Sequence, residues 1–259
     1  LGYDRDNGKA LVAPLGPGLP VIGHVRGDVS AVSDGVIEID VAGELVTGIG
    51  GVGRAVHGEI AMAVSDPTEE LRATAIDVGS AGRILVGGSR ASAETLTRAR
   101  AMGAAGIVLG GVLDKELRDF TASSARRRGL GGEDGGLAIM VVSGYGKVAM
   151  DGDLFSWLGR HDGHLASLFG ADARLFVYDA EPAPVHRSLP RAGDRVVLRR
   201  KPRAGMSGTL VRVLPAPHAS VSGLVTRSGI VRLDDGRSII APVANLVAMD
   251  ALEAPNGGG

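Results

Sequence analysis

The stretch RILVGGSRASAETLTRARAMGAAGIVLGG, residues 83–111, predicts the fold of the central part of the chain. It opens with an aliphatic run at 83–86, which ends in a glycine pair, and continues with apolar residues at helical spacing over 92–102. Gly103 closes that helix, and a second aliphatic run follows at 106–109. Two strands joined through a helix in this way pair in parallel, so the stretch predicts one β-α-β unit.

The same order of strand, glycine loop and helix continues beyond this unit. The run at 106–109 is followed by a helix whose apolar residues share one face, and a third strand at 137–142 precedes a helix around 152–159. Asp151 stands where a carboxylate would cap the first amides of that last helix. Three such units predict an α/β domain over residues 76–180 with a mostly parallel sheet.

The residues on either side of this domain are predicted to form separate units, which makes the chain a multi-domain α+β protein. Residues 1–75 hold short β-rich runs between turns and show no helical period, which predicts a small N-terminal β-sandwich or barrel. Residues 181–192 contain three prolines and are expected to be a semi-rigid linker. Residues 193–251 are expected to form a β-barrel, and residues 252–259 a flexible tail.

The C-terminal unit carries a short motif of turns and strands. Gly193-Asp194 is a turn, residues 195–198 are a short strand, and a glycine turn at 205–208 precedes a strand at 209–213. On these residues the unit resembles the KOW-type SH3-like barrels of transcription elongation factors and ribosomal proteins. The resemblance implies a surface that binds RNA, RNA polymerase or another protein rather than a catalytic site.

The same unit is basic. Residues 186–251 carry 11 Lys and Arg against 4 Asp and Glu, whereas residues 1–75 carry 5 against 11, although the net charge of the chain is −1. A local excess of one charge favours a partner of the opposite charge, so we expect basic side chains of this unit to touch a partner. The candidates are Arg195, Arg199, Arg200, Lys201, Arg203 and Arg212.

The aromatic content decides which partner is favoured. Residues 186–251 contain no Phe, Tyr or Trp, and single-stranded RNA is commonly bound by stacking its bases on such rings. A protein partner is therefore favoured, and RNA would be held through its phosphates. Two further interpretations stay open: a solvated basic loop, or a basic unit that docks on the acidic N-terminal part of its own chain.

A glycine-rich stretch follows each strand of the predicted α/β domain. In open α/β sheets ligands bind beyond the carboxyl ends of the strands, where small residues let a ligand approach the backbone and helix N-termini attract anions. We expect an anionic small molecule to bind at this edge. The candidates are Gly87, Gly88, Ser89, Gly110, Gly111, Ser143, Gly144, Tyr145, Gly146 and Lys147. The competing interpretation is that the glycines only allow tight turns between strand and helix.

Patterns for catalysis, cofactors and metals are incomplete in this sequence. The letters Gly48-x-Gly50-x-x-Gly53 lack the long helix that a dinucleotide fingerprint needs, so they predict a cluster of tight β-turns. Ser143 lacks the glycine two positions earlier that marks a nucleophile elbow. His161 and His164 have a glycine between them and no acidic partner set for zinc. We therefore predict no catalytic residue, no cofactor and no metal ion, and an enzymatic role is the less favoured one.

The order of the units as a whole is similar to a group of uncharacterised bacterial proteins. The residues that carry this similarity are the glycine-rich stretch 48–53, the loop at 143–146 and the terminal pattern Val231-x-Leu233-x-x-Gly236…Pro242-x-x-Asn245-Leu246. The resemblance implies the architecture and no particular activity.

The predicted function follows from the basic unit and the incomplete catalytic patterns. We expect a non-enzymatic interaction or scaffold protein that docks a protein or RNA partner, with an enzyme or regulator that binds an anionic metabolite as the alternative. No stretch reaches the roughly 20 apolar residues of a membrane span. The chain has no cysteine, which suits a reducing compartment, so we expect it to be cytoplasmic. The oligomeric state stays open.

Overall fold

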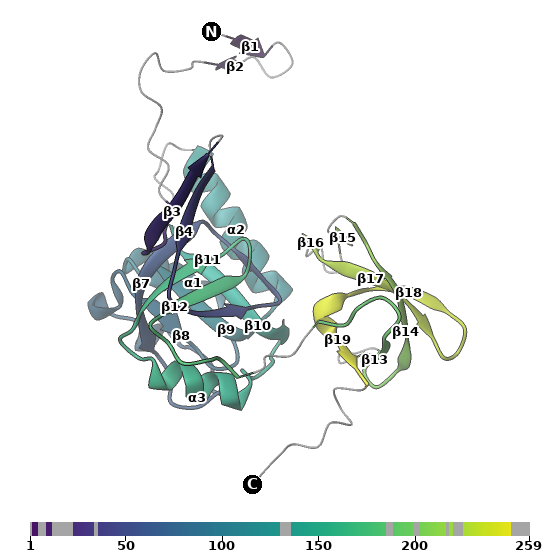
Figure 1. Cartoon of the computed structure of the whole chain (residues 1–259). Helices are drawn as coiled ribbons and strands as arrows, with labels where there is room; N and C mark the ends of the chain where they lie inside the picture. Colours follow the sequence, from purple (N-terminus) through teal and green to yellow (C-terminus); the bar gives the residue numbers. More distant parts are fainter. Residues whose placement is uncertain are drawn as a thin grey trace.

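Figure 1 shows the computed structural model of the chain, in which three parts follow one another: a β-hairpin near the N-terminus, a central α+β unit and a C-terminal antiparallel sheet. The described residues are 2–4, 9–11, 23–33, 36–129, 136–184, 189–198, 203–215, 218–219 and 225–249.

The central unit is built on one eight-stranded sheet, in the order β5-β12-β11-β7-β8-β9-β10-β6. The strands are β5 (Gly43–Thr47), β6 (Gly50–Val52), β7 (Ala55–Met62), β8 (Ile84–Val86), β9 (Gly106–Val112), β10 (Ala138–Tyr145), β11 (Leu165–Phe169) and β12 (Arg174–Tyr178). Strands β7, β8, β9 and β10 are parallel, and the remaining neighbours are antiparallel. The sheet is therefore mixed rather than mostly parallel, because residues on both sides of the predicted α/β units add antiparallel strands to it.

The two end strands of this sheet belong to one continuous segment. Only Gly48 and Ile49 separate β5 from β6, and their amides donate to the carbonyl oxygens of Ala173 and Val141 at 2.7 and 2.8 Å. Residues 43–52 thus pair with β12 on one side and with β10 on the other, and the sheet curls round to close at this segment, which we call the seam.

Glycine at the seam has a steric reason. A Cβ placed on Gly51 would lie 2.3 Å from the carbonyl oxygens of both Gly170 and Ile139, since backbone approaches this position from two sides. The glycine cluster at 48–53, which has the letters of a dinucleotide fingerprint, therefore permits close backbone packing where the sheet closes.

The helices cover both faces of the parallel strands. Helices α1 (Ala93–Ala101) and α2 (Asp114–Gly129) contribute Leu96 and Phe120 to the core on one face, and α3 (Gly152–Arg160) contributes Trp157 to the core on the other (Figure 1). The predicted cap is confirmed, because the Asp151 carboxylate accepts hydrogen bonds from the first amides of α3. Of the helices in the described part of the chain, none is long and apolar enough to cross a membrane.

Three short 3-10 helices complete the described helical structure. They are η1 (Ala73–Ala75), η2 (Val78–Ser80) and η3 (Val243–Asn245). The first two lie between β7 and β8, and the third lies in the C-terminal part.

The N-terminal residues differ most from the sequence prediction. Strands β5, β6 and β7 belong to the central sheet instead of a separate N-terminal β-sandwich or barrel. Alternation of apolar and polar residues identifies strands but does not identify their pairing partners, and Ile60 of β7 is fully buried in the central core. What remains apart are two hairpins, formed by β1 (Gly2–Asp4) with β2 (Lys9–Leu11), and by β3 (Asp28–Ser33) with β4 (Val36–Asp40).

The C-terminal part is a five-stranded antiparallel sheet in the order β18-β17-β14-β13-β19. The strands are β13 (Arg195–Leu198), β14 (Ser207–Val213), β17 (Ser228–Leu233), β18 (Ser238–Pro242) and β19 (Leu246–Ala248), with a small pair formed by β15 (His218–Ala219) and β16 (Val225–Thr226). Ala241 of β18 and Leu246 of β19 share one buried core, so the sheet curves and brings its two ends to the same core. The hairpin between β17 and β18 turns at Asp235-Gly236, where Gly236 has a φ of +87°.

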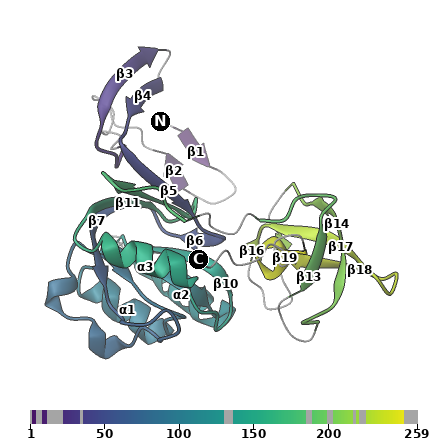
Figure 2. The same cartoon turned by 60° about the horizontal axis from the view of Figure 1, so that its bottom comes forward.

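The C-terminal part contacts the central unit (Figure 2). The hydroxyl of Tyr145, at the end of β10, lies 3.2 Å from the hydroxyl of Thr226. Ala244 of η3 is buried in the same core as α1 and α2. The proline-containing stretch begins against α3, because the indole N–H of Trp157 donates to the carbonyl oxygen of Glu181 at 3.1 Å.

Candidate functional site

The glycine-rich candidates lie at the carboxyl ends of β8, β9 and β10, where backbone hydrogen bonds join them. The amide of Gly110 donates to the carbonyl oxygen of Gly88 at 2.9 Å, and the amide of Gly111 donates to that of Ser89 at 2.6 Å. Gly144 pairs with Gly111 in the parallel register. The structure therefore brings these strand ends together at one edge of the central sheet.

Neighbouring backbone fills the space beside these glycines. A Cβ on Gly88 would lie 2.5 Å from the carbonyl oxygens of Asp66 and Glu69, and one on Gly110 would lie 2.3 Å from the amide nitrogen of Met150. The buried members of the candidate set are Gly87, Gly88, Ser89, Gly110, Gly111, Gly144, Tyr145 and Gly146. The geometry agrees with the competing interpretation, close packing of loop on strand, and an anion site at this edge stays a prediction.

Three candidates of that set, Ser143, Tyr145 and Lys147, have side chains in different surroundings. Lys147 is exposed, and the hydroxyl of Ser143 is buried without a hydrogen-bond partner among the described residues. Tyr145 has its hydroxyl beside Thr226 of the C-terminal part. A Cβ on Gly50 would lie 2.0 Å from that hydroxyl, so the seam leaves room for the tyrosine. Tyr145 therefore serves the contact between the two parts of the molecule.

The basic candidates fall into three groups. Arg195 is held in an ion pair, with Nη1 and Nη2 at 2.5 and 3.0 Å from the two carboxylate oxygens of Asp234. The Asp234 carboxylate accepts a hydrogen bond from Arg195, which has the larger effect, and another from Ser207. These bonds lower the pKa of Asp234 to about 2, so this carboxylate stays charged. Arg203 and Arg212 are exposed. The third group, Arg199, Arg200 and Lys201, lies outside the described residues.

Arg212 belongs to a mixed basic and apolar surface on the outside of the C-terminal sheet. Val231 and Leu233 of β17 point into the core, so Ile230 and Arg232, which alternate with them along the strand, point outward. Arg212 pairs with Ile230, which in turn pairs with Ile240 of β18. We call this surface the outer basic face, and its members are Val211, Arg212, Ile230, Arg232 and Ile240.

The outer basic face combines exposed apolar side chains with arginines that have no ion pair to any residue the structure describes. Val211 and Ile240 are 41% and 47% exposed. Within the described part of the chain neither Arg212 nor Arg232 forms an ion pair, whereas Arg195 and Arg237 do. Sequence reasoning missed Arg232, although the alternation over Ile230–Leu233 is a signal that could have placed it on the outside.

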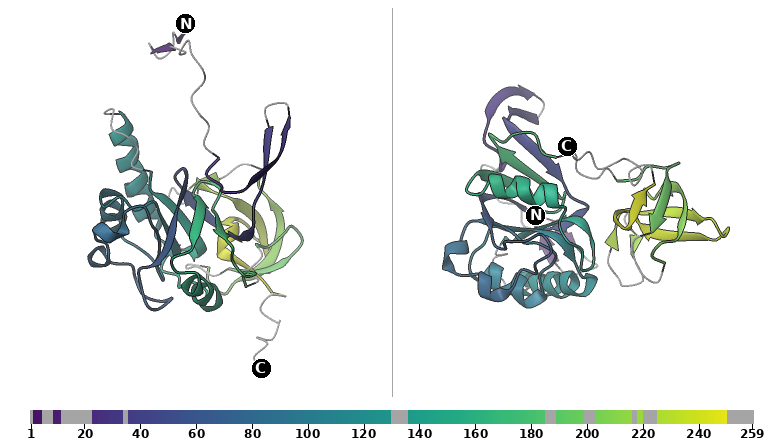
Figure 3. Two further views of the ribbon diagram at one scale, coloured as in Figure 1. Left: turned by 60° about the vertical axis from the view of Figure 1, so that its left-hand side comes forward. Right: turned by 90° about the horizontal axis from the view of Figure 1, so that it is seen from below.

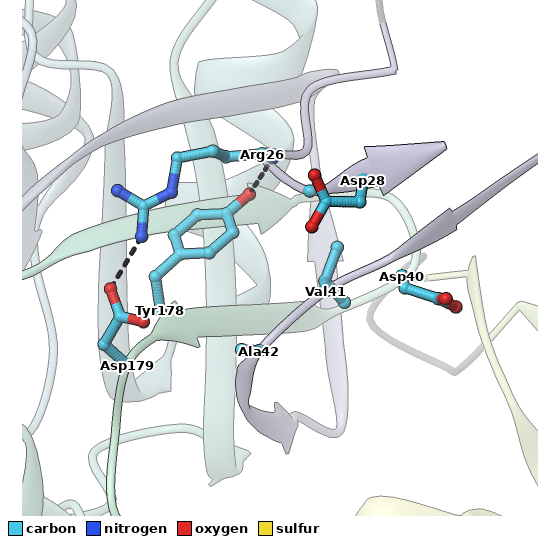
Figure 4. Close-up of a pocket in the computed structure, with 8 residues that line it drawn as sticks. Arg26, Asp28, Asp40, Val41, Ala42, Tyr178 and Asp179 are labelled. Carbon is cyan, nitrogen blue, oxygen red and sulfur yellow. Dashed lines mark hydrogen bonds and ion pairs between the residues drawn. The ribbon is translucent and has the colours of Figure 1, made fainter. Parts of the chain in front are cut away.

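A pocket of about 460 Å³ lies at the base of the β3–β4 hairpin, where that hairpin leaves the central sheet (Figure 4). The guanidinium of Arg26 lies 4.9 Å from the centre of the Tyr178 ring and 2.6 Å from a carboxylate oxygen of Asp179. The Arg26 amide donates to the Tyr178 hydroxyl at 2.7 Å, which fixes the start of the hairpin on β12.

Charge determines what this pocket could hold. Asp28 and Asp40 face each other across the hairpin register and, like Asp179, line the pocket, so three carboxylates stand against the single guanidinium of Arg26. This excess of negative charge favours a cationic group over a phosphate. Over the ranges that the structure describes, there is no cluster of three or more metal-ligating side chains.

The two helix-end histidines have structural partners. His161 is buried and its Nδ1 lies 2.8 Å from the carbonyl oxygen of Trp157, while the ring of His164 meets it edge-on at 4.9 Å. His161 is the residue that caps the end of α3, and His164 lies three positions beyond it. Both are polar residues at the end of a helix.

Comparison with known proteins gives no relative from which a function could be transferred. No protein-family model matches the chain, and no curated protein matches it. The interpretation of its surfaces therefore depends on their geometry and charge.

Proposed function

We propose that this chain is a non-enzymatic interaction protein whose C-terminal part, a KOW-type SH3-like barrel, docks a protein partner through its outer basic face. The observation that carries the proposal is the combination of exposed Val211 and Ile240 with two arginines that have no ion pair in the described structure. The antiparallel five-strand order around a shared core supports the assignment of the barrel.

The composition of this face favours protein over RNA. Arginine beside exposed aliphatic side chains is typical of protein interfaces, where apolar contact supplies affinity and charge selects the partner. A face that binds single-stranded RNA by stacking its bases would present aromatic rings, and residues 186–251 contain none. RNA held through its phosphates is the competing outcome, and the experiment below separates the two.

The proposal is tested with the full chain as bait in a lysate of its source cells, before and after RNase treatment. Arg212→Glu combined with Arg232→Glu should abolish capture of a partner that survives RNase, because like charges would then oppose an acidic surface. Arg72→Glu, at an exposed arginine of the central unit, is the matched control and should capture normally. Equal capture by the double variant and the wild type would refute the proposal, and loss of all capture after RNase would favour RNA.

A further inference from the structure

The β3–β4 hairpin projects from the central unit as an arm. Figures 1 and 3 show it extending beyond the body of the sheet, and its base is fixed by the Arg26–Tyr178 and Arg26–Asp179 contacts. A two-stranded hairpin buries little apolar surface of its own, so an arm of this kind gains stability when a partner covers it.

The pairing register gives the arm two distinct faces. Val32 pairs with Ile37 on one face, which is apolar. On the other face Asp28 pairs with Asp40, and Glu38 pairs with Ala31. We call this second side the acidic face, and its members are Asp28, Ala31, Ser33, Val36, Glu38 and Asp40.

The acidic face presents charge together with an apolar contact. Val36 is 57% exposed, and it stands one side-chain position from Glu38 on the same face of β4. Asp28, Glu38 and Asp40 are exposed and form no ion pair within the residues described. Ala31 and Ser33 are small, so a partner can approach this face closely.

The outer basic face has the complementary composition. It sets Arg212 and Arg232 beside exposed Val211 and Ile240, just as the acidic face sets carboxylates beside Val36. Opposite charges around an apolar contact are the pattern of a specific docking surface. The sequence alone left open that the basic unit docks on the acidic N-terminal part of its own chain, but in Figures 1 and 2 the arm lies well apart from the C-terminal sheet.

We propose that the partner of the outer basic face is the arm of a second copy of this chain, which docks there by its acidic face. This inference rests on the proposed function of the C-terminal part and names its partner. The contact joins two different surfaces, so it is head-to-tail: each copy offers one arm and one basic face, and association continues until a ring closes or a filament grows.

The test is sedimentation velocity of the full chain over a concentration series. The wild type should self-associate, and association should weaken as salt is raised, because exposed charges are screened. Glu38→Arg combined with Asp40→Arg should weaken association about tenfold or more, and so should Arg212→Glu combined with Arg232→Glu. Asp172→Arg, at an exposed acid of a turn in the central unit, is the matched control and should associate like the wild type.

Mixing gives the decisive result. The arm variant and the face variant should each sediment as monomers alone and associate when mixed, because the acidic arm of one then meets the basic face of the other. A chain that carries both reversals should self-associate again. Circular dichroism of each variant verifies that it is folded.

Two outcomes overturn the inference. One is a wild type that stays monomeric at all concentrations, and the other is a mixture of the two variants that stays monomeric while the wild type associates. The proposed function is judged separately: a monomeric wild type that still captures an RNase-resistant partner through Arg212 and Arg232 refutes the second-copy contact alone.

Discussion

Replacing Gly51 by alanine tests whether the central sheet closes at the seam. The added Cβ would lie 2.3 Å from two backbone carbonyl oxygens, those of Gly170 and Ile139, and neither can rotate away as a flexible side chain would. Overpacking against well-packed surroundings typically costs about 1–3 kcal/mol. We expect Gly51→Ala to lie near the upper end, about 3 kcal/mol, because the clash is with main chain on both sides.

The measurement is equilibrium urea unfolding followed by the fluorescence of Trp157, the single tryptophan of the chain, which is fully buried in the central core. In a separate thermal unfolding experiment, the same loss of about 3 kcal/mol would lower the midpoint by roughly 6–12 °C for a chain of this size.

Gly159→Ala is the matched control for this substitution. Gly159 lies in α3 with no atom within 4 Å of an added Cβ, and a helical glycine is less stable than alanine by roughly 0.5–1 kcal/mol, so this variant should gain stability by that amount. A Gly51→Ala protein as stable as the wild type would refute the closed seam, since an open sheet edge could accept the methyl group.

Three further substitutions probe the core, the ion pair and the contact between the two parts. Trp157→Ala should destabilise the chain by about 3–5 kcal/mol in thermal unfolding followed by circular dichroism, because it empties a fully buried site. Asp234→Asn should reduce stability at neutral pH and lose this effect at low pH. The folded pKa of Asp234 is about 2, below its usual value, so the carboxylate stabilises the fold above pH 4 and this contribution disappears as the pH falls toward 2. Tyr145→Phe removes the hydroxyl beside Thr226 and should cost about 1 kcal/mol, with faster hydrogen exchange confined to η3 and β16.

Each of these has a clear contrary result. An unchanged midpoint for Trp157→Ala would contradict the packing of α3 against the sheet. A destabilisation by Asp234→Asn that is the same at pH 2 and pH 7 would contradict a charged ion pair with Arg195. Unchanged exchange in η3 for Tyr145→Phe would show that Ala244 and its apolar neighbours hold the C-terminal part by themselves.

Local pattern was enough to place the helices and parallel strands of the central unit. The helices predicted at 92–102 and 152–159 are α1 (93–101) and α3 (152–160). The run at 83–86 contains β8 (84–86), and the run at 106–109 lies in β9. These elements are readable because helical spacing, a capping residue and a closing glycine act over a few neighbouring residues.

Partners distant in sequence could not be read in the same way. Residues 1–75 form strands as predicted, but only β5, β6 and β7 join the central sheet, while β3 and β4 form the arm. A strand with one apolar face can pair with any edge that buries that face, so its sequence does not select between them.

For the candidate surfaces, the sequence by itself determined the residue types: the basic charge of the C-terminal unit, the acidic charge of residues 1–75 and the glycines at the strand ends. Only the tertiary structure decided what surrounds them. It shows Gly88 and Gly110 against backbone, pairs Arg195 with Asp234, and leaves Arg212 and Arg232 exposed on one face. The physical reason is that the charge of a side chain and the backbone freedom of a glycine are properties of single residues. Burial and ion pairing instead depend on which distant segments the folded chain brings into contact.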